Sequence, residues 1–448
     1  MNIIENGGVT AAKGFSAAGT EAGIKYQGRM DMAMIYSQKP FNVAGTFTTN
    51  VVKAAPVIWD RDIVKGKGTA QAVVVNSGIA NACTGEQGLG YCRETAETAA
   101  ELLKINADDV LVGSTGVIGM QLRMDKLKEG VKALSGKLSP SLEVGNEAAR
   151  AIMTTDTHPK EVAVSVEIGG KTVTVGGMSK GSGMIHPNMC TMLAYVTTDA
   201  AIDGKLLQEL VSENVKDTFN MISVDGDTST NDTLLVMANG MADNEKISSK
   251  NEDYEKFREA LNYVNTSLAK MMAADGEGAT ALFEVQVTGA DTVENAKILA
   301  KSVITSSLTK AAIFGHDANW GRILCALGYS GVIFDPEKIE LWFESAAGKM
   351  LIFKDGVQAD YSEEEATKIL EEAGLKMNVV ATVASEEYPS GYVIYQDRKE
   401  GYTMKKGAVI NVRLSKGANR VSVPDVSILS STDMAKRRIE SFGLTYVE

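Results

Sequence analysis

The sequence is poor in the residues on which many hydrolytic and metal-dependent sites are built. Its 448 residues include only three histidines, His158, His186 and His316, and none lies beside a convincing serine or cysteine nucleophile. A serine triad needs an imidazole base, and a histidine-rich zinc site needs several such ligands. We therefore expect no metal site, and any enzyme here should use a base other than imidazole.

Cysteine, secretion signals and membrane segments are also scarce. The four cysteines, Cys83, Cys92, Cys190 and Cys325, show no metal-ligand spacing, so we interpret them as small buried residues in a reducing compartment. The start of the chain has neither a basic nor an apolar signal region, and no apolar run approaches the roughly 18 residues of a membrane span. These absences predict a cytoplasmic protein with no membrane partner.

Positive charge is in deficit, because the formal net charge is −12. A nucleic-acid partner usually needs a basic face, so none is expected. A hydrophobic content of 44% and a charged content of 23% are ordinary for a globular protein.

The pattern along the chain favours layered α+β architecture over a doubly wound parallel sheet. Strand and helix signals alternate without a strict βαβ rhythm. Two alternating runs, AVSVEI and KTVTVGG, flank Gly169–Gly170 and predict a hairpin. Amphipathic patterns predict helices from Leu206 to Phe219 and from Tyr254 to Met272, and LFEVQV predicts a strand from Leu282.

Thr191 becomes chemically interesting only if the Cys190–Thr191 bond is cut. It lies in KGSGMIHPNMCTMLAYVTTDA, which begins at Lys180. A cut would leave a hydroxyl and a free α-amine on one residue, and such an amine titrates at about 7.7–8.0. That is a nucleophile with its own base. Spacing alone, however, favours an ordinary loop threonine.

Three further positions could complete such a site. Ser114-Thr115-Gly116 is a small loop able to present donors to an oxyanion. Lys180 and Glu277 could hold a charged substrate, and Lys180 could depress the pKa of the new amine by like-charge repulsion. From spacing alone, each feature also has an ordinary structural interpretation. Ser114-Thr115-Gly116 would be a simple turn, Lys180 would be a solvated surface charge, and Glu277 would be a turn residue.

A calcium loop is the alternative reading of VDGDTSTND, which places Asp225, Asp227 and Ser229 at alternate positions. Counted from Asp225, the twelfth position is Val236, where an EF-hand needs a bidentate glutamate. The pattern therefore argues against calcium.

Several long motifs in order resemble the ornithine acetyltransferase (glutamate N-acetyltransferase) family of the arginine pathway. The resemblance runs from GGVTAAKGFSAAGTEAGIKYQG to about Glu365. Its strongest pieces are TTNVVKAAPV, VVVNSGIANACTG, STGVIG, AIMTTDT, MSKGSGMIHPNMCTMLAYVTTDA, SVDGDTSTNDTLL, ADGEGAT and ANWGRILCALGYSG.

The resemblance implies an α+β relative of N-terminal nucleophile folds that cleaves itself before Thr191. The α chain would be 1–190, and the acetyltransferase part of the β chain 191–370. Thr191 would move an acetyl group from N-acetylornithine to glutamate by a ping-pong reaction. No external cofactor is implied, acetyl-CoA as a second donor stays open, and an α2β2 heterotetramer is expected.

The same resemblance assigns site residues in this sequence. Thr115 and Gly116 match the oxyanion hole, and the substrate-binding positions are Thr154, Lys180, Thr191 and Glu277. Two positions depart from the family: Cys190 replaces the usual alanine, and Ala281 stands where lysine is common.

The C-terminal segment 371–448 resembles PASTA repeats, with one repeat and a truncated second copy. EEAGLKM, YPSGYVIYQ, MKKGAVINVRLSKG and the residues after VPDV carry this likeness. It replaces the family's usual terminal segment, which contacts substrate. Two alternatives therefore stay open: an N-terminal nucleophile hydrolase or aminopeptidase, and a cell-wall-binding protein acting through this tail.

Overall fold

The computed structural model describes residues 1–186, 192–371, 376–383, 393–396 and 409–415, with the single residues 432 and 436. Contacts divide the chain into two compact units. One comprises Met1–Gly315 and Gly321–Phe334, and the other comprises His316–Trp320 and Asp335–Glu448. The division predicted at residues 190 and 370 rests on a cleavage and on family resemblance, and it stays a prediction.

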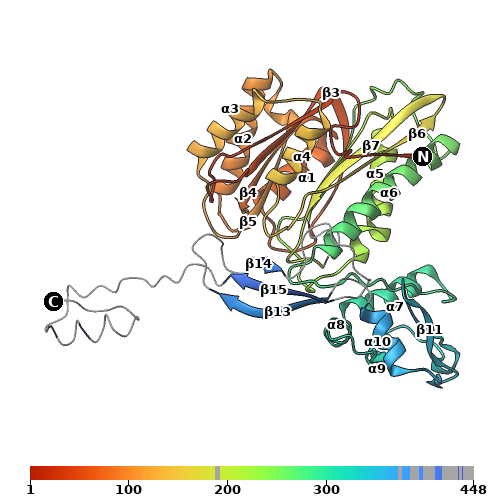
Figure 1. The fold of residues 1–448 in the computed structure, drawn as a ribbon. Coiled ribbons are helices and arrows are strands. Elements are labelled where there is room, and N and C mark those ends of the chain that lie inside the picture. Colours follow the sequence, from red (N-terminus) through yellow and green to blue (C-terminus); the bar gives the residue numbers. More distant parts are fainter. Residues whose placement is uncertain are drawn as a thin grey trace. The chain divides into compact units, whose positions relative to one another are not determined.

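The larger unit is built on a nine-stranded mixed sheet (Figure 1). Its order is β1-β6-β7-β8-β9-β3-β4-β5, and β2 pairs with β3 off this path. The strands are β1 (Asn2–Ile4), β2 (Phe15–Thr20), β3 (Met32–Phe47), β4 (Thr69–Ile79), β5 (Val110–Val117), β6 (Lys160–Ile168), β7 (Lys171–Lys180), β8 (Leu193–Thr198) and β9 (Thr233–Ala238).

The two halves of this sheet pack face to face. Tyr195 of β8 belongs to an inner apolar cluster with Val73 of β4 and Leu111 of β5, strands from the other half of the sheet. Its neighbour Val196 belongs to an outer cluster instead. A Cβ on Gly113 of β5 would lie 2.0 Å from the Tyr195 Oη. Glycine there lets the two halves approach closely.

Helices cover both outer faces and give the unit four layers. Figure 1 shows α2 and α3 on one side and α5 and α6 on the other. Residues of α5 and α6 fill the outer cluster of the β6–β9 half, while residues of α2 and α3 cover the β3–β5 half. The helices are α1 (Ala55–Gly66), α2 (Gln87–Leu103), α3 (Met124–Ser135), α4 (Leu142–Ala151), α5 (Gly204–Asp217), α6 (Glu252–Ala274), α7 (Val293–Thr305), α8 (Ser307–Phe314) and α9 (Trp320–Gly328). The predicted layered α+β fold is confirmed.

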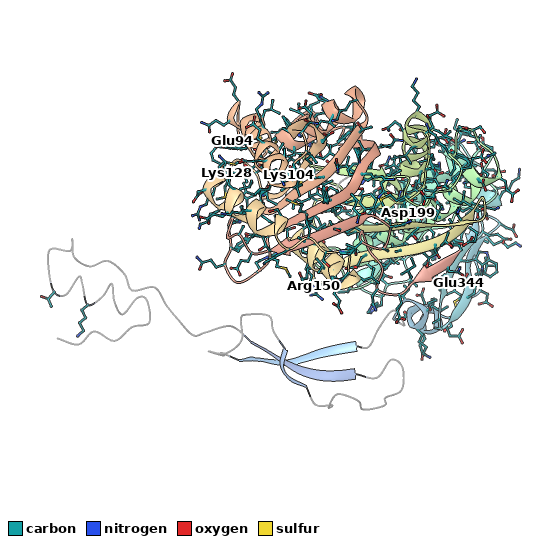
Figure 2. The ribbon with its side chains drawn as sticks, turned by 90° about the horizontal axis from the view of Figure 1, so that it is seen from above. Glu94, Lys104, Lys128, Arg150, Asp199 and Glu344 are labelled. Carbon is teal, nitrogen blue, oxygen red and sulfur yellow. The ribbon has the colours of Figure 1, made fainter. Side chains whose placement is uncertain are left out.

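Local predictions hold where pattern and turn chemistry agree. β6 and β7 form the expected hairpin, and Gly169 and Gly170 both have positive φ in its turn. α5 and α6 match the two predicted amphipathic helices within a few residues. On the outer surface, Lys128 of α3 pairs with Glu94 of α2 at 2.7 Å (Figure 2).

The strand predicted from Leu282 is wrong. Residues 282–287 alternate between exposed and half-buried, as the pattern indicated, but they belong to no strand. Lys270 of α6 pairs with Glu284 at 2.7 Å, so the segment lies against this helix. Alternation predicts which side chains are covered, whereas a strand also needs a neighbouring strand with which to pair.

The smaller unit contains two three-stranded sheets and α10 (Glu363–Glu371). The first sheet comprises β10 (Leu341–Ser345), β11 (Gly348–Lys354) and β12 (Val357–Gln358). In the second, β15 (Val409–Ser415) pairs parallel to β13 (Lys376–Val383) and antiparallel to β14 (Val393–Gln396). Most residues of the PASTA-like segment, including the whole truncated second copy except Thr432 and Lys436, lie outside the described residues.

The cysteine prediction is correct only in part. Cys92 is buried, but Cys83 and Cys325 are exposed, and Cys190 lies outside the described residues. Within the described ranges, no helix is long and apolar enough to cross a membrane, and no cluster of three or more side chains could hold a metal ion.

Candidate active site

One cavity of about 400 Å³ brings together five residues that the sequence singled out: Thr115, Gly116, Thr154, Lys180 and Glu277. They come from four separate stretches of the chain. Met192 and Leu193 line the same cavity. Thr191 and Cys190 lie outside the described residues, but Thr191 is covalently joined to a residue of the cavity wall.

Thr115 and Gly116 lie at the end of β5, where the strand passes very close to β4. Gly116 has φ +130° and is paired with Gly78. A Cβ on Gly116 would lie 2.2 Å from the Gly78 carbonyl carbon. The position therefore requires glycine for its conformation and for its space.

Asn231 fixes this turn from the neighbouring loop. Its side-chain amide donates to the carbonyls of Ala80 at 2.6 Å and Ser114 at 2.8 Å. Ser114 in turn donates to Asn76 at 2.7 Å. Sequence reasoning did not single out Asn231, although it lies within the motif SVDGDTSTNDTLL.

Lys180 is buried at the end of β7, so its interpretation as a solvated charge is wrong. Its ammonium lies 3.4 Å from the Thr115 hydroxyl, to which it donates. Burial lowers the pKa of Lys180, and the Lys160 cation lowers it further, while the carboxylate of Asp156 opposes the shift. The cation beside the Thr115 turn suits a bound carboxylate.

Asp156 is a buried carboxylate that binds the backbone of the cavity residue Thr154 and of Gly181, which follows the cavity residue Lys180. One carboxylate oxygen accepts from the Gly181 N–H at 2.7 Å and from the Lys160 ammonium at 2.7 Å. The other accepts from the Thr154 N–H at 3.0 Å. Burial alone would raise its pKa, but Lys180, Lys160 and these hydrogen bonds outweigh burial and lower the pKa to about 2. The residue lies within AIMTTDT, two positions after Thr154. This proximity to a predicted substrate-binding residue is the sequence feature that could have identified Asp156.

This depressed pKa predicts an acid-sensitive contribution to stability. A carboxylate of this kind stabilises the fold above its unfolded pKa, and the contribution is lost as pH falls from about 4 to about 2. The shift of Asp156 from 3.8 to about 2 corresponds to about 2 kcal/mol. As the pH falls over this interval, we expect the free energy of unfolding of the wild type to decrease by about 2 kcal/mol more than that of Asp156→Asn. Urea unfolding at a series of pH values measures this, and parallel curves would contradict it.

Asp232 is a second buried carboxyl group in the cavity wall. Burial raises its pKa well above the usual range, although hydrogen bonding with the side chains of Thr48 and Ser229 and with the Met192 backbone opposes the shift. Among the described residues, no donor reaches its Oδ2. A carboxyl group therefore contacts the backbone one residue after Thr191.

Glu277 follows α6 and lies at the exposed side of the cavity. Its N–H donates to the Ser182 carbonyl at 2.9 Å. A Cβ on Gly183 would lie 2.4 Å from the Glu277 Oε2, so the carboxylate occupies space that only glycine leaves open. A carboxylate here suits a substrate ammonium.

Asp225, the first residue of the rejected calcium loop, instead binds backbone. Its carboxylate accepts from the N–H groups of Met184 at 2.5 Å, Ile185 at 2.9 Å and Asp227 at 3.0 Å. Val224 N–H also donates to the Ile185 carbonyl at 2.6 Å. The loop therefore anchors the chain just before residue 187.

The cavity combines a buried cation, a glycine-containing turn and an exposed carboxylate. Lys180 and Glu277 offer opposite charges to the two ends of a small zwitterionic molecule. The turn at Thr115–Gly116 can present donors to a developing oxyanion. The arrangement suits acyl transfer between amino acids, provided that a nucleophile is present.

Comparison with known proteins gives consistent matches. The profile of the ArgJ family matches residues 16–392, and so extends past residue 371, where the PASTA-like segment was expected to begin. The arginine biosynthesis bifunctional protein ArgJ of Caldanaerobacter subterraneus subsp. tengcongensis is 50% identical over 372 residues, 83% of this chain and 91% of that protein. The protein of the same name from Listeria monocytogenes is 46% identical over 381 residues, 85% of this chain and 93% of that protein. The solved structure of the ornithine acetyltransferase of Mycobacterium tuberculosis in complex with ornithine is 44% identical to this chain. The match covers 43% of this chain and 98% of that chain, with a TM-score of 0.40.

Proposed function

The chain belongs to the ArgJ family, and we propose that it transfers an acetyl group from N-acetylornithine to glutamate in arginine biosynthesis, using Thr191 as its nucleophile. Self-cleavage of the Cys190–Thr191 bond would free the Thr191 amine. The observation that carries the proposal is the cavity that joins Thr115, Gly116, Lys180 and Glu277 to Met192.

In the first half-reaction, the Thr191 hydroxyl attacks the acetyl carbonyl carbon of N-acetylornithine. Its own α-amine takes the hydroxyl proton, as in other N-terminal nucleophiles. Donors at Thr115 and Gly116 stabilise the oxyanion. The C–N bond then breaks, the proton passes to the departing nitrogen, and ornithine leaves an acetyl ester on Thr191.

In the second half-reaction, the amine of glutamate attacks this ester. The acetyl group moves to the glutamate nitrogen, and the proton returns to the Thr191 oxygen. Lys180 and Thr154 receive the α-carboxylate that both substrates share, and Glu277 receives the side-chain ammonium of ornithine. Because one pocket serves both substrates, ornithine must leave before glutamate binds.

The proposal has three further parts, of which the first two are expected of a member of this family and the third departs from it. Acetyl-CoA is a second acetyl donor, in keeping with the word bifunctional in the names of the relatives. The cleaved chains form an α2β2 heterotetramer in the cytoplasm. The segment 371–448 is a PASTA-like tail that stands where the family's usual terminal segment would be.

The distinction between transferase and hydrolase gives a direct prediction. We expect ornithine release from N-acetylornithine to be at least about tenfold faster with glutamate than without it, because an amine is a better nucleophile than water toward the acetyl ester. Amino-acid analysis of timed samples measures both rates. Equal rates, with free acetate as the product, would instead establish the N-terminal nucleophile hydrolase.

A further inference from the structure

A buried ionic cluster lies beside the cavity, and its centre plays no part in the chemistry above. The ammonium of Lys160 lies 2.7 Å from Asp156 and 2.6 Å from Asp275. The side chains of Lys160 and Asp156 are fully buried, and that of Asp275 is 3% exposed. Asp156, Lys160 and Asp275 are called the Lys160 cluster.

The two carboxylates of the Lys160 cluster lie next to residues on different sides of the cavity. Asp156 accepts from the N–H groups of Thr154 and Gly181, the residue after Lys180. Asp275 ends α6, two residues before Glu277. It also accepts from the N–H of Thr157 at 3.0 Å and from the Thr157 hydroxyl.

Stability alone does not account for such a cluster. Desolvation of buried ions offsets much of their attraction, so well-packed apolar residues are often as stable. Fixed register between elements is the best-attested benefit of a buried ionic group. Here Asp156 and Lys160 precede the predicted cut and Asp275 follows it, so the cluster would join two separate chains.

We propose that Lys160 is a positioning residue, which bridges Asp156 and Asp275 so that Thr154 and Lys180 of one chain keep their spacing to Glu277 of the other. Lys160 itself is fully buried and reaches the substrate only through these partners. The inference rests on the proposed function for its ligand, ornithine, which must contact Lys180 and Glu277 together.

The test compares two buried aspartates. Asp275→Asn removes one charge from the Lys160 cluster and leaves the rest of the cluster in place. Asp199→Asn is the control (Asp199 is labelled in Figure 2): its carboxylate is also buried and accepts the N–H groups of Lys13 at 2.9 Å and Thr174 at 2.7 Å. Asp199 follows β8, whereas the cavity lies at the start of that strand.

Ornithine affinity, measured by calorimetry on the purified full-length protein, is the main readout. We expect Asp275→Asn to weaken ornithine binding about tenfold or more and to raise KM more than it lowers kcat, because misplaced binding groups weaken substrate contacts. Asp199→Asn should stay within about twofold, since distant sites act independently. If Asp275→Asn does not fold, Thr157→Val removes one hydroxyl donor and should give a smaller loss in the same direction.

Three outcomes separate this inference from the proposed function. If the two aspartate variants bind ornithine equally well and show similar losses in melting temperature, the Lys160 cluster stabilises the fold but does not position the binding groups. A wild-type protein that binds ornithine but transfers no acetyl group would refute the proposed reaction, while the binding comparison would still decide the role of Lys160. A wild type that does not bind ornithine would overturn both.

Discussion

Thr191→Ala is expected to leave a single uncut chain of 47.7 kDa with no detectable acetyl transfer. Alanine has no hydroxyl to attack the preceding carbonyl, so the Cys190–Thr191 bond stays intact. Without the cut, residue 191 also has no free amine to act as base. Loss of either group removes the proposed nucleophile, so the effect should be complete rather than graded.

Intact-mass analysis and the acetyl-transfer assay check this prediction together. Thr191→Ser is the matched variant, because it retains both hydroxyl and amine, and it should still cleave and transfer. Cys190→Ala introduces the residue usual in the family and should cleave like the wild type. Transfer by an uncut Thr191→Ala protein would show that another group attacks the acetyl donor.

The residues found from sequence are those that carry chemistry inside contiguous motifs. Thr115 and Gly116 lie together in STGVIG, and Glu277 lies in ADGEGAT. Each motif marks one wall of the cavity. The fold class was predictable for a similar reason, because the β6–β7 hairpin and the long helices are local patterns that need no knowledge of the rest of the chain.

The residues missed are those whose role depends on distant partners. Lys160 and Asp275 are 115 positions apart, and only the packing of α6 beside β6 brings them together. Lys180 was singled out as a candidate for substrate binding, but its burial was not predictable, because nothing in its local sequence reveals that β7 is covered on both faces. The strand predicted for residues 282–287 was wrong for a related reason. The alternation of its side chains is a local pattern, but a strand also needs a partner strand, and this segment pairs with none of the described strands.

Gly116→Ala is expected to lower kcat by about 10²–10³-fold, the loss typical of one displaced oxyanion donor, with little change in KM. A Cβ at this position would lie 2.2 Å from the backbone of Gly78, which cannot move aside as a side chain can. The turn after β5 must therefore shift, and the donors at Thr115 and Gly116 shift with it.

Gly119→Ala separates this contact from simple backbone strain. Gly119 also has positive φ, +84°, but no atom lies within 4 Å of its added Cβ. Both variants place an alanine at positive φ, which strains the backbone in each, while only Gly116→Ala meets β4. Steady-state kinetics with thermal unfolding should show comparable folded fractions and a loss of kcat confined to Gly116→Ala. Equal kcat in the two variants would mean that the Thr115–Gly116 turn does not stabilise the oxyanion, since moving its donors would then have left the transition state unchanged.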